Sequence, residues 1–218
     1  MPRVARGLVD GFIYHIINRG NGGQKIFHNN KDYGAFIRLI LEAKTKYIID
    51  ILAYCLMPNH FHMLLLPAKA KDLSKWMQWL MTSHVRRYHR HYSGSGHIWQ
   101  GRFKSFIVQN DEHLLTVLRY IEGNPVRAGL VNSAKIWKWS SHLESSKQKH
   151  RILTSAPPIE LPRDWTSYVD MPLTDKELGC LRKSVNRQTP LGKSEWVVEV
   201  CKQFGLESTI NPVGRPRK

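Results

Sequence analysis

The feature that most constrains the fold is a mainly apolar run at residues 57–66, which contains the triplet His60-Phe61-His62. An apolar run of this length predicts a strand, in which successive side chains point to opposite faces. His60 and His62 therefore share one face, while Phe61, Met63 and Leu65 share the other. Two neutral imidazoles a few Å apart can hold one divalent cation. At this point, two ordinary surface or core histidines are an equally good interpretation.

The signals along residues 12–142 alternate between strand and helix. Strands are expected at residues 12–19, 48–56, 61–66 and 99–108, and helices at residues 32–47, 73–92 and 110–124. Up to the fourth strand, this gives the order β-α-β-β-α-β. That order predicts an α+β fold, a ferredoxin-like split βαβ antiparallel sheet with helices packed on one face.

The helix expected at residues 110–124 brings a phenol and an amide together. Asn110 is the expected N-cap, and a Gly-x-Pro sequence marks the end of the helix. Tyr120 and Asn124 lie one turn apart on the same face. A tyrosine can act as a covalent nucleophile, and an amide oxygen one turn away can complete a metal site beside it. The alternative for Tyr120 is an amphipathic tyrosine at the edge of a domain.

The charge balance favours a polyanionic partner. The 218 residues contain 33 Lys and Arg against 17 Asp and Glu, a formal net charge of +16. A surplus of this size favours a nucleic-acid-binding protein over a soluble basic protein of another kind. The three cysteines, Cys55, Cys180 and Cys201, are scattered and odd in number, so they indicate neither a disulfide framework nor a zinc knuckle.

Competing catalytic signatures are absent from the sequence. Gly192-Lys193-Ser194 lacks the earlier glycine of a P-loop, since Arg187 stands at that position, and neither H-E-x-x-H nor G-x-S-x-G occurs. These observations exclude a P-loop ATPase, a zincin and a serine hydrolase, and no nucleotide cofactor is expected. With no signal peptide and no apolar run of 18 residues, we expect a cytoplasmic protein without a membrane partner.

Several ordered blocks of sequence carry a resemblance to a known family. The blocks are Tyr14-His15-Ile16-Ile17-Asn18-Arg19-Gly20-Asn21, Met57-Pro58-Asn59-His60-Phe61-His62, His97-Ile98-Trp99-Gln100-Gly101-Arg102-Phe103-Lys104, the run from Arg119-Tyr120-Ile121-Glu122-Gly123-Asn124-Pro125 to Leu130, and Trp137-Lys138-Trp139-Ser140-Ser141. They resemble those of the single-tyrosine HUH transposases, and within them the REP-associated tyrosine transposases of bacteria. The resemblance covers roughly residues 10–142 and resumes near the C-terminus.

The resemblance implies a metal-dependent transposase and endonuclease located beside the bacterial nucleoid. His60, His62 and Asn124 would hold Mg²⁺ or Mn²⁺, and Tyr120 would attack a phosphodiester to form a 5′-phosphotyrosyl intermediate. The implied substrate is single-stranded DNA folded as the hairpins of repetitive extragenic palindromes (REP). His15 and His113 are candidate helpers. Two alternatives stay open: a replication or mobilisation nickase with the same catalytic residues, and a hairpin-binding module without catalysis.

Residues in four places, most of them basic, are candidates for DNA contacts. They are Arg19, Gly20 and Asn21 in a Gly-rich turn, Arg86, Arg87 and Arg90 on the helix at residues 73–92, Arg102 and Lys104 in the strand at residues 99–108, and Arg215 and Arg217 in an AT-hook-like tail. Each has an ordinary alternative: a strand-ending turn, a solvated helix face, edge-strand cations that prevent aggregation, and a disordered basic tail.

The residues after 142 divide into two parts. Residues 1–142 form the expected catalytic domain, and the proline-containing residues 143–172 have the character of an extended connector. Residues 173–218 contain a capping box at Thr174 and a helical pattern at residues 194–204. These short helices form either a DNA-binding appendage or a segment that docks on the main domain. An extension that folds back favours a monomer, although dimers occur in the superfamily.

Overall fold

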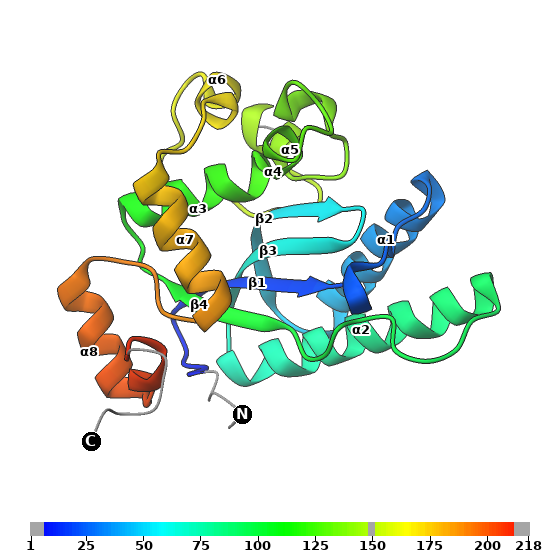
Figure 1. Cartoon of the computed structure of the whole chain (residues 1–218), viewed down its shortest axis with the longest axis horizontal. Coiled ribbons are helices and arrows are strands. Elements are labelled where there is room, and N and C mark those ends of the chain that lie inside the picture. The colour runs from blue at the N-terminus through cyan, green and yellow to red at the C-terminus, as the bar shows by residue number, and fades with distance from the viewer. Residues whose placement is uncertain (1–6, 148–150, 212–218) are drawn as a thin grey trace.

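The four strands form one antiparallel sheet in the order β2-β3-β1-β4 (Figure 1). The computed structural model describes residues 7–147 and 151–211. The strands are β1 (Ile13–Arg19), β2 (Ile49–Met57), β3 (His60–Pro67) and β4 (Lys104–Val108). The first two helices connect β1 to β2 and β3 to β4, which confirms the ferredoxin-like α+β fold.

Eight α-helices and three short 3₁₀ turns complete the described chain. The helices are α1 (Asn30–Lys46), α2 (Ala70–Tyr92), α3 (Glu112–Glu122), α4 (Asn124–Arg127), α5 (His142–Lys147), α6 (Trp165–Asp170), α7 (Asp175–Arg187) and α8 (Ser194–Phe204). The 3₁₀ turns are η1 (Asn21–Gly23), η2 (Ala134–Ile136) and η3 (Glu207–Thr209). Within the described residues, no helix is long and apolar enough to cross a membrane.

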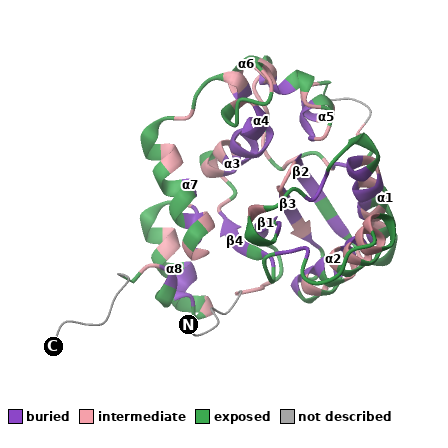
Figure 2. Cartoon of the chain, turned by 45° about the vertical axis from the view of Figure 1, so that its right-hand side comes forward, coloured by how far each residue is buried: buried purple, intermediate pink, exposed green. Residues whose placement is uncertain are grey.

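Helices cover both faces of the sheet, because side chains on each strand alternate between two apolar cores. Phe61 and Met63 pack in one core with residues of α1 and α2. Leu64 and Phe106 pack in the other core with residues of α3. The expectation of helices on one face therefore holds for α1 and α2 only. The helix that carries Tyr120 lies on the opposite face, and the buried strands separate the two layers (Figure 2).

Two predicted boundaries are wrong for identifiable reasons. The N-cap of α3 is Asp111, whose side chain accepts a hydrogen bond from the backbone N–H of His113, and not Asn110. The strand expected at residues 99–108 is regular only from Lys104, because the positive φ of Gly101, 148°, departs from the negative φ of a regular strand. By contrast, the capping box of Thr174 with Glu177 and the helix at Ser194–Phe204 are confirmed.

Segments from residue 139 onward close both edges of the sheet. Along β2, the backbone N–H of Leu56 donates to Trp139 O, and the N–H of Ser155 donates to Ile51 O. Along β4, the N–H of Leu191 donates to Ile107 O, and the N–H of Gln109 donates back to Leu191 O. Figure 1 shows α7 and α8 on the β4 side of the molecule. Residues 151–172 are therefore packed against the sheet and α3 rather than forming a simple extended connector.

Candidate active site

The two histidines of the triplet lie side by side on the face of β3 that is covered by α3. His60 pairs with Met57 and His62 pairs with Cys55 across β2, so both side chains point to the same face, as the alternation predicts. Their ring centroids are 5.1 Å apart with an interplanar angle of 84°. His62 is buried, whereas His60 is only partly buried at the start of the strand.

Neighbouring polar groups engage one nitrogen of each ring. The Nδ1 of His60 lies 2.7 Å from Asn59 Oδ1, to which it donates, and the Nδ1 of His62 lies 2.9 Å from the Nε2 of His15. Among the described residues, neither Nε2 has a hydrogen-bond partner. A histidine held through one nitrogen presents the other in a fixed orientation, which is the arrangement found around metal-ligating histidines. His15, a candidate helper, thus orients His62.

Burial keeps these imidazoles neutral. Loss of solvation and, to a smaller extent, the nearby cations Arg19 and Arg127 together lower the pKa of His60 to about 4. Burial also lowers the pKa of His15 to about 3 and holds the pKa of His62 well below its usual value. A neutral imidazole has a free lone pair at physiological pH, as metal ligation requires.

Tyr120 faces this histidine group from the end of α3, and Asn124 and Arg127 of α4 contact Tyr120. The Tyr120 ring lies 5.5 Å from the His62 ring and 6.2 Å from the His15 ring, between centroids. The side-chain amide of Asn124 donates to Tyr120 O at 3.3 Å. Its oxygen accepts from Arg127 Nη2 at 2.6 Å. The helical spacing therefore places the Tyr120 phenol ring beside these imidazoles, and the amide of Asn124 one turn further along the chain.

This donor set fits a divalent cation. Two imidazole nitrogens and one amide oxygen, all uncharged, suit a borderline ion such as Mn²⁺, and Mg²⁺ when substrate phosphate supplies more oxygen ligands. The free Nε2 atoms are the structural observation that supports this fit, because their Nδ1 partners already fix the ring orientations.

Residues 8–124, which contain this entire donor set, match the family model Y1_Tnp, described as IS200-like transposases. The chain belongs to this family. It is 29% identical over 136 residues to a REP-associated tyrosine transposase of Haemophilus influenzae, a match that covers 57% of this chain and 71% of the relative. It is 28% identical over 104 residues to a REP-associated tyrosine transposase of Escherichia coli, which covers 47% of this chain and 59% of that protein.

A solved structure of a REP-associated tyrosine transposase bound to a REP hairpin has the same fold. It superposes with a TM-score of 0.57 at 20% sequence identity, covering 75% of this chain and 96% of that structure. The resemblance noted from the sequence is thus confirmed, and the protein is an IS200-like transposase of the tyrosine class.

Two of the candidate DNA-binding cations of this transposase lie beside the histidines. Arg19 pairs with His60 across β1 and β3, and Lys104 pairs with Ile17, two residues before Arg19. Directly paired residues point to the same face, so both cations share the histidine face of the sheet. Both are exposed. They are therefore free to contact a phosphate backbone that enters the site.

The Gly-rich turn of the transposase differs from the expectation. The backbone N–H of Gly20 donates to Asn59 O, and that of Asn21 donates to Ile98 O, both at 2.8 Å. These amides fasten the turn to neighbouring loops and are not available to a phosphate. Arg102 precedes β4, so it does not share a strand face with Lys104 as alternation had suggested.

The basic end of α2 is partly occupied by protein contacts. Arg87 lies 3.6 Å from Asp32, whose carboxylate also accepts from Tyr92. Arg86 and Arg90 are exposed and face solvent. Arg215 and Arg217 lie outside the described residues. Of this group, Arg86 and Arg90 remain the candidates for phosphate contacts within the described part of the transposase.

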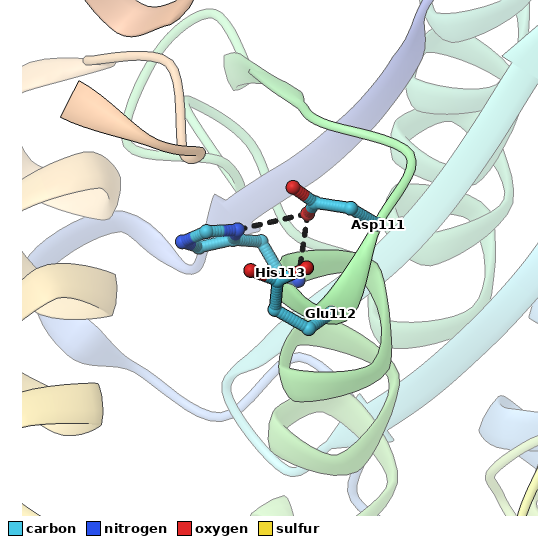
Figure 3. A group of neighbouring side chains, drawn as sticks. All are labelled: Asp111, Glu112 and His113. Carbon is cyan, nitrogen blue, oxygen red and sulfur yellow. Dashed lines mark hydrogen bonds and ion pairs between the residues drawn. The ribbon is translucent and has the colours of Figure 1, made fainter. Parts of the chain in front are cut away.

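His113, the second candidate helper, belongs to the opposite end of α3. Its Nδ1 lies 2.8 Å from Asp111 Oδ1, and with Glu112 these side chains form a cluster whose ligand atoms all lie within 4.8 Å of one another (Figure 3). Asp111 also accepts from the backbone of His113. The cluster thus satisfies the first turn of the helix, about 10 Å along the axis from Tyr120. The structure does not bring His113 to the histidine pair.

Sequence reasoning missed Arg127 and Glu122. Arg127 lies three residues after Asn124 and seven after Tyr120, so the helical spacing used for those two residues could have identified it. Glu122 gave no usable signal, because its partners come from residues 141–165, far along the sequence.

Glu122 is a buried carboxylate that holds the end of α3 in place. One oxygen accepts from the hydroxyls of Ser141 and Ser145, at 2.5 and 2.7 Å. The other accepts from Trp165 Nε1 at 2.6 Å and lies 3.0 Å from His142 Nδ1. Since Glu122 is two residues from Tyr120, these bonds fix the helix that carries the phenol.

Replacing Glu122 by glutamine should lower the free energy of unfolding by about 1–3 kcal/mol, because an amide nitrogen would face donors that now bind a carboxylate oxygen. Urea unfolding followed by circular dichroism measures this change. Glu112→Gln is the matched control, since that exposed carboxylate has one weak ion pair, 3.8 Å from Lys193. Equal stabilities of the two variants would contradict the anchoring role.

The free energy of unfolding should fall as the pH decreases from about 6.5 towards 4. Burial lowers the pKa of both His15 and His84 to about 3, so both stay neutral in the folded protein and are protonated on unfolding. The unfolded state then binds more protons, at a cost of up to about 1.4 kcal/mol per pH unit for each histidine. Urea titrations in this pH range measure the slope.

His84→Gln separates this effect from general acid instability. The variant should take up about one proton fewer than the wild type on unfolding near pH 5. His84 packs against Phe36 and Trp99 in the core that contains α1 and α2. A wild-type stability that stays level down to pH 4.5 would show that these histidines are not held neutral.

Proposed function

We propose that this transposase cleaves and rejoins single-stranded DNA beside REP hairpins, with Tyr120 as the nucleophile. The supporting observation is the position of the Tyr120 ring, 5.5 Å from the ring of His62 in a pair of histidines with free Nε2 atoms. A phenol that only filled a domain edge would not require two neutral, oriented imidazoles beside it. The REP hairpin enters this proposal from the relatives that are named for it.

In the proposed reaction, the Tyr120 oxygen attacks the phosphorus of a phosphodiester and its proton leaves to water. A new bond forms between phosphorus and the tyrosine oxygen, the bond to the 3′ oxygen breaks, and that oxygen takes up a proton as a free 3′-OH. The product is a 5′-phosphotyrosyl enzyme. Attack by a second 3′-OH on the phosphotyrosyl bond reverses these changes and joins two strands. No ATP is needed, because the phosphotyrosyl bond keeps the energy of the phosphodiester that was cleaved.

The protein's own residues hold the reacting groups. His60, His62 and the Asn124 oxygen would ligate Mg²⁺ or Mn²⁺, which when bound polarises the phosphate oxygens. His15 fixes His62 through the 2.9 Å contact, and Glu122 fixes the end of the helix that carries Tyr120. Arg19 and Lys104, exposed on the same face, would position the strand through its phosphates, with Arg86 and Arg90 further along α2.

We further propose that the protein acts as a monomer. Association through a sheet edge needs an unpaired strand, and later segments of the same chain bind both β2 and β4. On this basis residues 173–211 serve as a docking segment of the catalytic domain and not as a separate DNA-binding module. The AT-hook-like tail keeps its proposed role as a minor-groove contact.

The test uses one hairpin oligonucleotide, drawn from repeats that flank the gene, in two labelled forms. After incubation with Mn²⁺, only the 3′-labelled strand should move to a protein-sized band on a denaturing gel, because the tyrosine is joined to the 5′ end of the downstream fragment. Chelation of the metal should abolish the band. A shift of the 5′-labelled strand, or binding without an adduct, would contradict the proposal and favour the non-catalytic hairpin-binding module.

A further inference from the structure

Arg127 is a cation without a carboxylate partner at the edge of the candidate active site. Its guanidinium carbon lies 4.2 Å from the centroid of the Tyr120 ring. Its Nη2 donates to Asn124 Oδ1 at 2.6 Å, and its Nη1 donates to Tyr120 O at 3.4 Å. Among the described residues, no Asp or Glu lies within ion-pair distance of it. Arg127 lies just after residues 8–124, the range that the family model matches.

Arg127 lies next to the side chains of the candidate active site. The Tyr120 ring, over which its guanidinium lies, is 5.5 Å from the His62 ring between centroids. An unpaired cation at such a place is suited to an anion that arrives with the substrate.

The Asn124 oxygen is the point where two cations would compete. The Asn124 amide nitrogen donates to Tyr120 O, which fixes the direction of the amide and leaves Oδ1 facing Arg127. A metal ion bound to Asn124 Oδ1 would lie close to the Arg127 guanidinium, because both would contact the same oxygen atom. Two cations this close repel each other, so occupation by one displaces the other.

We propose that Arg127 holds the Asn124 oxygen in the metal-free protein and, when a metal takes that oxygen, turns its guanidinium to the scissile phosphate. This inference rests on the proposed function. The planar fork can bind two phosphate oxygens at once, which lysine cannot do. Arg127 is thereby both a competitor of the metal and a contact of the reacting phosphate.

One substitution of Arg127 should raise the affinity for Mn²⁺ and lower the rate of adduct formation. Arg127→Met keeps an apolar stem and removes the charge, so the DNA-free protein should bind Mn²⁺ about 3- to 10-fold more tightly, as measured from the free Mn²⁺ signal in electron paramagnetic resonance. At saturating Mn²⁺, formation of the hairpin adduct should be about 10- to 100-fold slower, because a charged contact with the phosphate is lost.

Two further variants control for charge and folding. Arg182→Met removes an exposed cation of α7 whose charge acts on Arg127 but which has no contact with Asn124 or Tyr120 in the described structure, so both measurements should stay near wild type. Arg127→Lys keeps the charge without the fork and should give intermediate values in both. Thermal unfolding of each variant establishes that the protein tested is folded.

Weaker Mn²⁺ binding by Arg127→Met would mean that the arginine only holds Asn124 in place, and would overturn the proposal. Unchanged Mn²⁺ binding or an unchanged adduct rate would also overturn it. The Mn²⁺ measurement needs no DNA, so it still decides the competition if the wild type forms no adduct, a result that would count against the proposed function itself.

Discussion

Replacing Tyr120 by phenylalanine should reduce formation of the covalent protein–DNA adduct by at least about 1,000-fold, because the nucleophilic oxygen is removed and no other group replaces it. Binding to the hairpin should be largely retained, since the exposed cations that would contact phosphates are unchanged. The adduct is measured on a denaturing gel with 3′-labelled DNA, and binding is measured by fluorescence anisotropy.

Tyr168→Phe is the matched control for this result. Tyr168 is partly buried on α6 and, like Tyr120, has an arginine over its ring, with Arg119 at 4.8 Å from the centroid. Its ring has no contact with a histidine in the described structure. The control should form the adduct at the wild-type rate. An adduct that persists in Tyr120→Phe would assign the nucleophile to another residue.

Replacing His60 or His62 by alanine should weaken Mn²⁺ binding to the DNA-free protein by on the order of 100-fold or more. In other metal sites, mutating residues that only support the ligands already lowers metal affinity by about 10- to 100-fold. The adduct should decrease in parallel at a fixed Mn²⁺ concentration and recover in part as more metal is added. Isothermal titration with Mn²⁺ measures the affinity.

The two histidine variants should differ in stability. His62 is buried and in contact with His15, so its loss leaves a cavity and an unpaired ring, whereas His60 is only partly buried. His91→Ala, an exposed histidine near the end of α2, should change neither property. If both active-site variants bound Mn²⁺ like the wild type, the metal would have to use other ligands, and the proposed mechanism would fail.

Local patterns predicted the parts of this protein that depend on local sequence. Alternation along residues 57–66 placed His60 and His62 on one face, and helical spacing placed Tyr120 beside Asn124, as the structure has them. The error at β4 came from Gly101, whose backbone conformation interrupts an otherwise extended stretch. The N-cap error was one residue, because Asn110 and Asp111 are both good caps and sequence alone does not separate them.

The parts that sequence did not predict depend on contacts between distant segments. Residues 143–172 have prolines and little periodicity, which favours a connector, yet Trp165 of this segment donates to Glu122 in the core. No pattern within either segment indicates that bond. The placement of α3 on the face opposite α1 and α2 was missed for the same reason, since apolar periodicity indicates that a face is buried but not which side of the sheet it meets.

The closure of both sheet edges by residues from 139 onward has a consequence for how the chain can be divided. The range that the family model matches ends at Asn124, before Trp139 and Leu191, whose backbones bind the sheet edges at β2 and β4, and before the donors that surround Glu122. A fragment that ended at Asn124 would expose two strands ready to pair with other chains. The later residues therefore belong to the same folding unit as the sheet that they enclose.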